Sequence, residues 1–201
     1  MLQVLSKYRI AKRLGAGVFE QTQTQKFALV EANSIKKRGR GPSDYGRQLI
    51  EKQKVRFTYG LSERQLSNYA KVAFTTAHPT ISLHKALNMR ADMVAYAAGL
   101  APTRRGARQA VSHGHFTING VRVTTPSYKM KIGDVMAVRN GNQKSPLYAG
   151  LAEKNAEGSR AIPAWVDVDI KTLSAKVVAE PQYAHLEGGL DYATVFEFYS
   201  R

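Results

Sequence analysis

Apolar residues recur at helical spacing through the first half of the chain, in segments separated by capping and breaking residues. Ser43 can accept hydrogen bonds from the first free N–H groups of one helix, and Gly60 is placed to end that helix. A second helix opens at Ser62, three residues before Gln65, which is the spacing of a capping box, and it ends at His78-Pro79. These two adjacent helices predict a helical first domain.

A third helix is predicted from about Ile81 to Ala98, because apolar positions form one stripe along it and Gly99 and Pro102 follow. The stripe is Leu83, Leu87, Ala91, Val94 and Ala98.

A short fourth helix, capped by Thr103 and ended by Gly114, is predicted from Arg104 to about Ser112. At about 100° per residue its side chains divide between two arcs. The apolar arc holds Ala107, Ala110 and Val111, and the opposite arc holds Arg104, Arg105, Arg108, Gln109 and Ser112.

The period of the pattern changes to two after Gly114. Residues 116–118 and 121–123 alternate apolar with polar side chains on either side of Asn119-Gly120. Asn-Gly between alternating runs predicts a tight hairpin, because both turn positions need positive φ. Further strands are predicted at 135–138 and 166–170.

The remaining segments carry weaker patterns. Residues 1–42 lack sustained periodicity, residues 140–161 resemble a surface excursion rich in Gly, Asn, Pro and Ser, and the aromatic end at 192–199 is expected to pack. We therefore predict an α+β fold. A mainly helical first domain (1–80, with a basic arm, and with the tail from about 187 to 201 packing back on it) precedes a small α+β module with a C-terminal extension (81–186). In that module two helices pack on a short antiparallel or mixed sheet.

The charge of the chain is high and unevenly distributed. Of 201 residues, 30 are Lys or Arg and 15 are Asp or Glu, a net charge of +15. Residues 1–139 carry 24 Lys and Arg against 7 Asp and Glu, whereas residues 140–201 carry 6 against 8. Solubility alone gives no reason to segregate charge, so the pattern favours one face turned to a polyanion.

The composition excludes several other classes of protein. Cysteine is absent, which excludes disulfides and thiolate metal sites. The longest apolar run, 93–101, is far shorter than the ~20 residues of a membrane span, and cations interrupt any apolar run at the start. We expect a soluble intracellular protein with no contact to a membrane.

Cationic side chains concentrate in three places. Guanidinium groups suit phosphate because their planar fork can pair two oxygens at once. A glycine-spaced arm, the first predicted helix with the start of the second, and the fourth helix supply the candidates for contact with phosphate, which the resemblance described below implies to be that of RNA: Lys36, Lys37, Arg38 and Arg40; Arg47, Lys52, Lys54, Arg56 and Arg64; Thr103, Arg104, Arg105, Arg108, Gln109, Ser112, His113 and His115.

Enzyme and metal chemistry find little support. His113 and His115 lack further ligands nearby, so hydrogen bonds to a phosphate, a ribose or the local backbone are the better interpretation. Asp167 and Asp169 share one face of a predicted strand, where a solvated surface explains them better than acid–base catalysis. No catalytic residue, cofactor or metal is predicted.

The sequence from Thr103 to His115, Thr-Arg-Arg-Gly-Ala-Arg-Gln-Ala-Val-Ser-His-Gly-His, resembles the signature of the ribosomal S-four RNA-binding module. The likeness continues through 118–120, 126–128 and 133–135. Upstream, 43–66 resembles the helical domain of the bacterial-type small-subunit S-four family, and 163–165 and 197–201 resemble its tail. The likeness spans about residues 43–201.

The resemblance implies a structural constituent of the small ribosomal subunit and not an enzyme. Family members bind a multi-helix junction in the 5′ domain of small-subunit ribosomal RNA and act early in assembly. With neighbouring proteins three and five they surround the messenger RNA entry channel and influence decoding accuracy. The location would be the ribosome of the cytoplasm, or the matrix or stroma of an organelle. The alternatives are a free-standing quality-control RNA binder and an accessory module of an RNA-modifying enzyme.

This chain departs from the family pattern at several positions. The early region of the family often carries clustered cysteines that can bind zinc, and these are absent here. Ala91 and Ala97 stand where the family usually has Leu and Arg, which implies one lost RNA contact at Ala97 and looser packing of the third helix.

Overall fold

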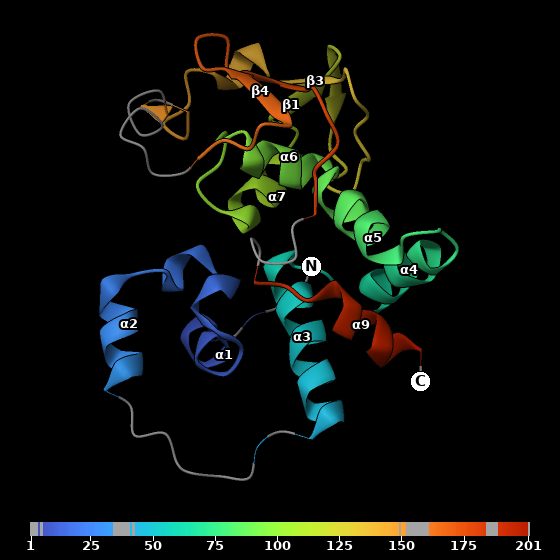
Figure 1. Ribbon diagram of the computed structural model, residues 1–201. Helices are drawn as coiled ribbons and strands as arrows, with labels where there is room; N and C mark the ends of the chain where they lie inside the picture. The colour runs from blue at the N-terminus through green and yellow to red at the C-terminus, as the bar shows by residue number, and fades with distance from the viewer. Residues whose placement is uncertain are drawn as a thin grey trace. The chain divides into compact units, whose positions relative to one another are not determined.

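A computed structural model describes residues 4, 6–33, 41, 43–148, 150–151, 161–183 and 189–200. The chain divides into two compact units, residues 1–83 with 183–201, and residues 84–182. Each unit is described by itself, with the labels of Figure 1. The cationic arm at 36–40 lies outside the described residues.

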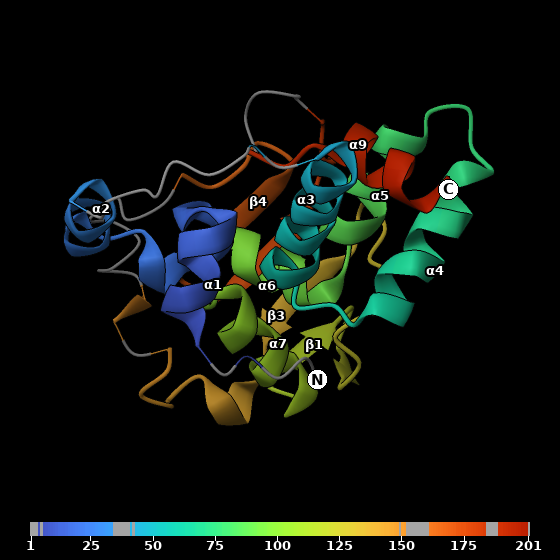
Figure 2. The same cartoon turned by 90° about the horizontal axis from the view of Figure 1, so that it is seen from below.

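The first unit is helical. Its elements are α1 (Lys7–Leu14), η1 (Ala16–Val18), η2 (Glu20–Thr22), α2 (Gln25–Ala32), α3 (Asp44–Thr58), α4 (Glu63–Phe74), the start of α5 (Pro79–Asn88) and α9 (Tyr192–Tyr199). Helix α9 lies beside α3 in both Figure 1 and Figure 2. The hydroxyl oxygens of Tyr59 and Tyr192 are 2.9 Å apart, and the ring centres of Phe74 and Phe196 are 4.7 Å apart. The aromatic end of the chain is therefore part of this core.

The predicted caps of α3 and α4 are confirmed. The backbone N–H of Gly46 donates to Ser43 Oγ at 3.2 Å, so Ser43 begins α3. At α4 the side chain of Ser62 accepts from the N–H of Gln65, and the Gln65 side chain accepts from the N–H of Ser62. Two backbone donors that the helix cannot pair internally are thereby satisfied.

Two helices, α1 and α2, form where the sequence shows no sustained periodicity. Each has eight residues, and together they bury only Ala11, Leu14 and Phe27. A helix this short presents too few apolar positions for a periodic signal, and it depends on tertiary packing for its stability. Here the packing comes from Val18, at the end of η1, and from Phe19, between η1 and η2.

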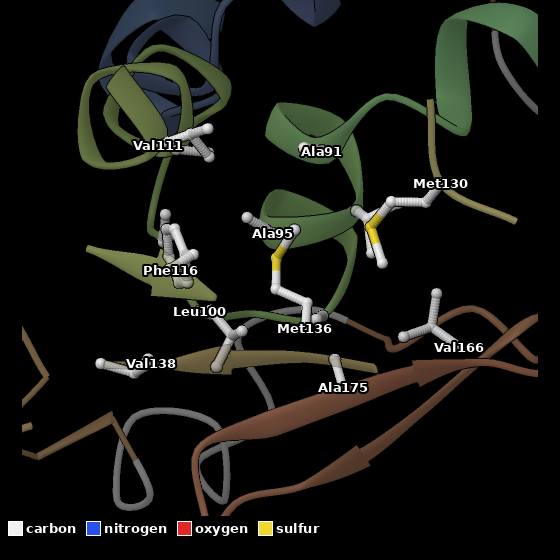
Figure 3. Close-up of a cluster of buried hydrophobic side chains, with 14 of the residues drawn as sticks. Ala91, Ala95, Leu100, Val111, Phe116, Met130, Met136, Val138, Val166 and Ala175 are labelled. Atoms are coloured by element: carbon white, nitrogen blue, oxygen red, sulfur yellow. The ribbon is translucent and has the colours of Figure 1, made fainter. Parts of the chain in front are cut away.

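The second unit packs helices on a sheet. It contains the rest of α5, α6 (Ala91–Ala97), α7 (Arg104–Ser112), β1 (Phe116–Ile118), β2 (Val121–Val123), β3 (Val135–Val138), η3 (Asn140–Asn142), β4 (Val166–Asp169) and β5 (Ser174–Val177). The strands form one antiparallel sheet in the order β2-β1-β3-β5-β4. In Figure 3, Met136 extends from β3 towards Ala95 on α6, and Val111 on α7 lies above Phe116 on β1. The predicted α+β fold is confirmed.

The Asn-Gly hairpin forms as predicted. Asn119 and Gly120 have φ values of 50° and 81°, and Ile118 pairs with Val121 directly across the turn. Both residues occupy the left-handed region, which Asn and Gly adopt with least strain.

The single third helix predicted at 81–98 is wrong, because the chain breaks into α5 and α6 at Arg90. Arg90 is extended, with φ −76° and ψ 145°, and forms an isolated bridge with Lys129. The N–H groups of Ala91 and Asp92 donate to the carbonyls of Tyr128 and Pro126. Hydrogen bonds to the segment 126–129 thus replace the helical hydrogen bonds that these two N–H groups would otherwise make.

The interpretation of 140–161 as a surface excursion is also wrong in part. Tyr148 and Leu151 are buried in the core of the second unit. Strand β5 was not predicted, although Ala175 and Val177 alternate with exposed neighbours. Four residues give a weak period-two signal.

Candidate RNA-binding surface

Helix α7 separates an apolar face from a cationic one. Ala107 and Val111 are fully buried, whereas Gln109 and Ser112 are exposed. The three arginines of the helix, Arg104, Arg105 and Arg108, are half-buried. Thr103 caps the helix by accepting from the N–H of Gly106 at 3.0 Å. The positive end of the helix dipole and the arginines of the first turn thus lie together.

Two of the α7 arginines are positioned by groups of α6. The guanidinium carbon of Arg104 lies 4.5 Å from the centre of the Tyr96 ring, a cation–π distance. Arg108 Nη1 lies 3.9 Å from Asp92 Oδ2. Both contacts restrict long side chains before any ligand arrives, which lowers the entropy lost on binding.

Asp92 is the buried centre of this arrangement. Arg90 donates from Nε to Asp92 Oδ1 at 2.9 Å and from Nη2 to Oδ2 at 2.7 Å, a two-bond fork. The two side chains are 1% and 3% exposed. Because an unpaired buried charge is costly, each depends on the other. No motif in the sequence indicates that Arg90 and Arg108 both contact Asp92.

At the end of α7 the backbone turns through Gly114, which has φ 72°. A Cβ at this position would collide with the Arg122 guanidinium, which donates from Nη2 to the carbonyl of His113 at 3.2 Å. Arg122 is exposed on the hairpin and adds a cation beside α7. Sequence reasoning missed it, although its position between Val121 and Val123 put it on the polar face of the strand.

The two histidines of this corner differ in environment. His113 is exposed, whereas His115 is half-buried, with Nδ1 3.1 Å from the Tyr148 hydroxyl. Burial, followed by the charges of His113 and Arg139, lowers the pKa of His115. Its imidazole is therefore neutral at pH 7. Burial also raises the pKa of Tyr148 to about 12, so the phenol keeps its proton.

The cations of α3 have partners within the first unit. Lys52 Nζ lies 2.9 Å from Glu63 Oε1 and 4.1 Å from the centre of the Phe198 ring, and its side chain is 8% exposed. Arg56 Nη1 lies 3.6 Å from Glu63 Oε2. Lys52 is thus largely buried, with its charge turned to Glu63 and to the Phe198 ring.

The other basic residues of this region lie nearer to solvent. Lys54 Nζ contacts Glu51 Oε1 at 2.5 Å in a half-buried pair, and Arg47 pairs with Asp44 on the exposed start of α3. Arg64 is exposed on α4. Arg47 and Arg64 are thus the accessible members of the group predicted in the first unit.

Comparison with known proteins gives this arrangement a context. A family model described as "Ribosomal protein S4/S9 N-terminal domain" matches residues 5–89, and one described as "S4 domain" matches residues 89–136. "Small ribosomal subunit protein uS4" of Roseiflexus castenholzii is 36% identical over 197 residues, covering 96% of each chain. The protein of the same name from Borrelia duttonii is 35% identical over 202 residues, covering 98% of this chain and 97% of its own. The one from Levilactobacillus brevis is 38% identical over 199 residues, covering 96% of each.

The chain belongs to the uS4 family. The S4 domain match covers α6, α7 and the β1–β2 hairpin, which carry the arginines and histidines described above. The uS4 family is structural and non-enzymatic. In the described part of the chain, no helix is long and apolar enough to cross a membrane.

Proposed function

We propose that this protein is a structural constituent of the small ribosomal subunit that grips ribosomal RNA with α7 and its flanking residues. The observation that carries the proposal is a capped helix with three arginines and no acidic residue, seated by its apolar face on the sheet core. Arg122, His113 and His115 extend this surface beyond the end of the helix.

The physical basis is recognition of shape and phosphate. The deep, narrow major groove of A-form RNA resists entry by side chains, so a folded RNA is held by its backbone and by its unpaired bases. Cations that neutralise phosphates release counterions, which makes the affinity fall steeply with salt.

The finer part of the proposal follows the family resemblance. The target is a helical junction in the 5′ domain of small-subunit ribosomal RNA, and binding there nucleates assembly. The neighbours are proteins three and five, which with this protein line the messenger RNA entry channel and influence decoding accuracy. The protein then resides on the ribosome of the cytoplasm or of an organelle. Crosslinking mass spectrometry on intact small subunits tests these contacts.

The affinity test removes two charges from α7. Arg104→Ala with Arg108→Ala should weaken binding to a transcript of the junction and reduce the slope of log affinity against log salt by about 1–2, because about 0.7–0.9 counterions are released per phosphate contact. Binding is measured by filter retention across a salt series.

A matched control removes two exposed lysines from the β4–β5 hairpin. Lys171→Ala with Lys176→Ala changes the net charge equally and should leave the slope unaltered. Equal slope changes in both variants would show that overall charge, rather than α7, governs binding. Circular dichroism verifies that both variants fold.

A further inference from the structure

A small cavity opens beside α7 in the second unit. Its volume is about 180 Å³. The walls come from the loop after α6, from one side and the end of α7, and from the segment before residue 149, and they include Pro102, Gln109, Ala110, His113, His115 and Tyr148. Two stretches distant in sequence, 100–115 and 147–148, therefore meet here, which explains why no sequence motif indicates the cavity.

The walls combine flat rings with a few polar edges. The His115 ring centre lies 6.1 Å from that of His113 and 6.0 Å from that of Tyr148. Pro102 and Ala110 contribute apolar surface, and the exposed Gln109 amide offers both a donor and an acceptor. Such walls suit a planar, partly polar ring system.

Size and charge narrow the choice of occupant. The volume falls below the roughly 300–1,000 Å³ of pockets for drug-sized ligands, so one ring system is the appropriate scale. The helix that forms one wall carries Arg105 and Arg108 and no carboxylate, which favours a ring attached to a polyanion. RNA recognition commonly splays single bases out of the strand and stacks them on aromatic or His side chains.

We propose that this cavity receives one unstacked nucleobase from a single-stranded segment of the RNA held along α7. The base lies among the rings of His113, His115 and Tyr148, and its polar edge meets the Gln109 amide. The inference rests on the proposed RNA-binding function and adds a base-dependent contact to the phosphate grip.

The test compares two probes with the full-length protein. One is a single-stranded oligoadenylate RNA, and the other is an oligonucleotide of the same length and backbone that lacks bases. We expect the protein to prefer the base-bearing probe by about tenfold, the scale of one base stacked on a ring. Ala110→Trp fills the cavity and should abolish that preference while leaving affinity for the abasic probe unchanged.

Two control variants isolate the cavity from general stacking. Ala110→Ser retains the space and should retain the preference. Val121→Trp adds the same indole on the exposed hairpin, where Val121 is 69% exposed, and should also retain it. Equal affinity of the parent protein for both probes, or a preference that survives Ala110→Trp, would overturn the proposal.

A second measurement does not depend on how well Ala110→Trp folds. An oligoribonucleotide with 4-thiouridine should photocrosslink to the tryptic peptide 109–122 of the parent protein, and absence of that crosslink would refute the base site. A cavity that instead accepts a side chain of another protein would give neither base preference nor crosslink. Loss of binding to the abasic probe in Arg104→Ala with Arg108→Ala tests the α7 grip separately, so the two proposals can fail independently.

Discussion

Helices α3 and α7 both carry rows of cations, yet they place them in different surroundings. Helix α3 contains Asp44 and Glu51 among its cations, and Glu63 of α4 adds a further carboxylate that Lys52 and Arg56 share. Helix α7 contains no acidic residue, and its contacts with α6 run to a tyrosine ring and to a carboxylate already forked by Arg90.

The comparison separates two uses of positive charge. On α3, Lys52 stabilises the first unit internally and is largely withdrawn from solvent. On α7, the arginines stand on a helix with no acidic residue of its own, and Arg108 shares the Asp92 carboxylate with Arg90, so a net positive charge is left for a phosphate backbone to neutralise. The two helices carry similar rows of cations in the sequence. They differ in the number of carboxylates that lie beside those cations in the structure.

The largest effect is expected where the surroundings of α7 depend on a buried charge. Asp92→Ala leaves Arg90 buried without its carboxylate and should lower the free energy of unfolding by about 3–5 kcal/mol. Urea denaturation followed by circular dichroism measures it. Asp167→Ala, on the exposed face of β4, should change stability by no more than about 0.5 kcal/mol. A loss below about 1 kcal/mol for Asp92→Ala would contradict the assigned role.

The next effect tests the internal use of charge on α3. Lys52→Ala removes a charged hydrogen bond of the kind that contributes about 1.5–3 kcal/mol, and because Glu63 stays half-exposed the expected loss of stability is about 1–2 kcal/mol. Because Lys52 is largely buried, the affinity of Lys52→Ala for the junction transcript should stay within about twofold of that of the parent protein. A drop in affinity comparable to that of the α7 double variant would erase the distinction between the helices.

The two helices can also be compared at their caps. Thr103→Ala and Ser43→Ala each remove an acceptor for a backbone N–H and should each cost about 1 kcal/mol. Only Thr103→Ala should also weaken RNA binding, because it loosens the start of α7. Thr103→Ser, which keeps the oxygen, serves as the control in thermal unfolding and filter retention.

The smallest expected effect is a pH dependence of stability, which arises from Glu63 beside the cations of α3. Burial of Glu63 opposes its ionisation, but hydrogen bonds from Lys52 and Tyr199 outweigh burial and lower the Glu63 pKa below its ordinary value of 4.5. Ionised Glu63 therefore stabilises the fold above pH 4.5, and that contribution is lost as the pH falls through the folded pKa.

Glu63→Gln should accordingly flatten the acid limb of stability against pH. The change is expected to be below about 1 kcal/mol, since solvent screens a half-exposed pair. Thermal unfolding from pH 7 downwards measures it, with Asp167→Asn as a control. If stability falls equally with decreasing pH in Glu63→Gln and in the parent protein, ionised Glu63 does not stabilise the fold.

Local signals account for the elements that sequence reasoning placed well. Ser43, Ser62 and Thr103 begin their helices by bonds to residues three positions away, and Asn119-Gly120 turns a hairpin through its own backbone angles. The placement of the α7 arginines on one face of the helix is also a local property, because the spacing of residues along an uninterrupted helix decides which face each side chain occupies.

Sequence by itself thus determined the α+β class, the capped cationic helix and the hairpin that follows it. Tertiary structure decided where the long apolar stripe breaks at Arg90, that Lys52 is withdrawn beside Glu63, and that Tyr148 meets His115 beside α7. The physical reason is the separation along the chain between the residues that contact one another. Caps and turns are satisfied within a few residues, whereas these contacts depend on partners that only folding brings close.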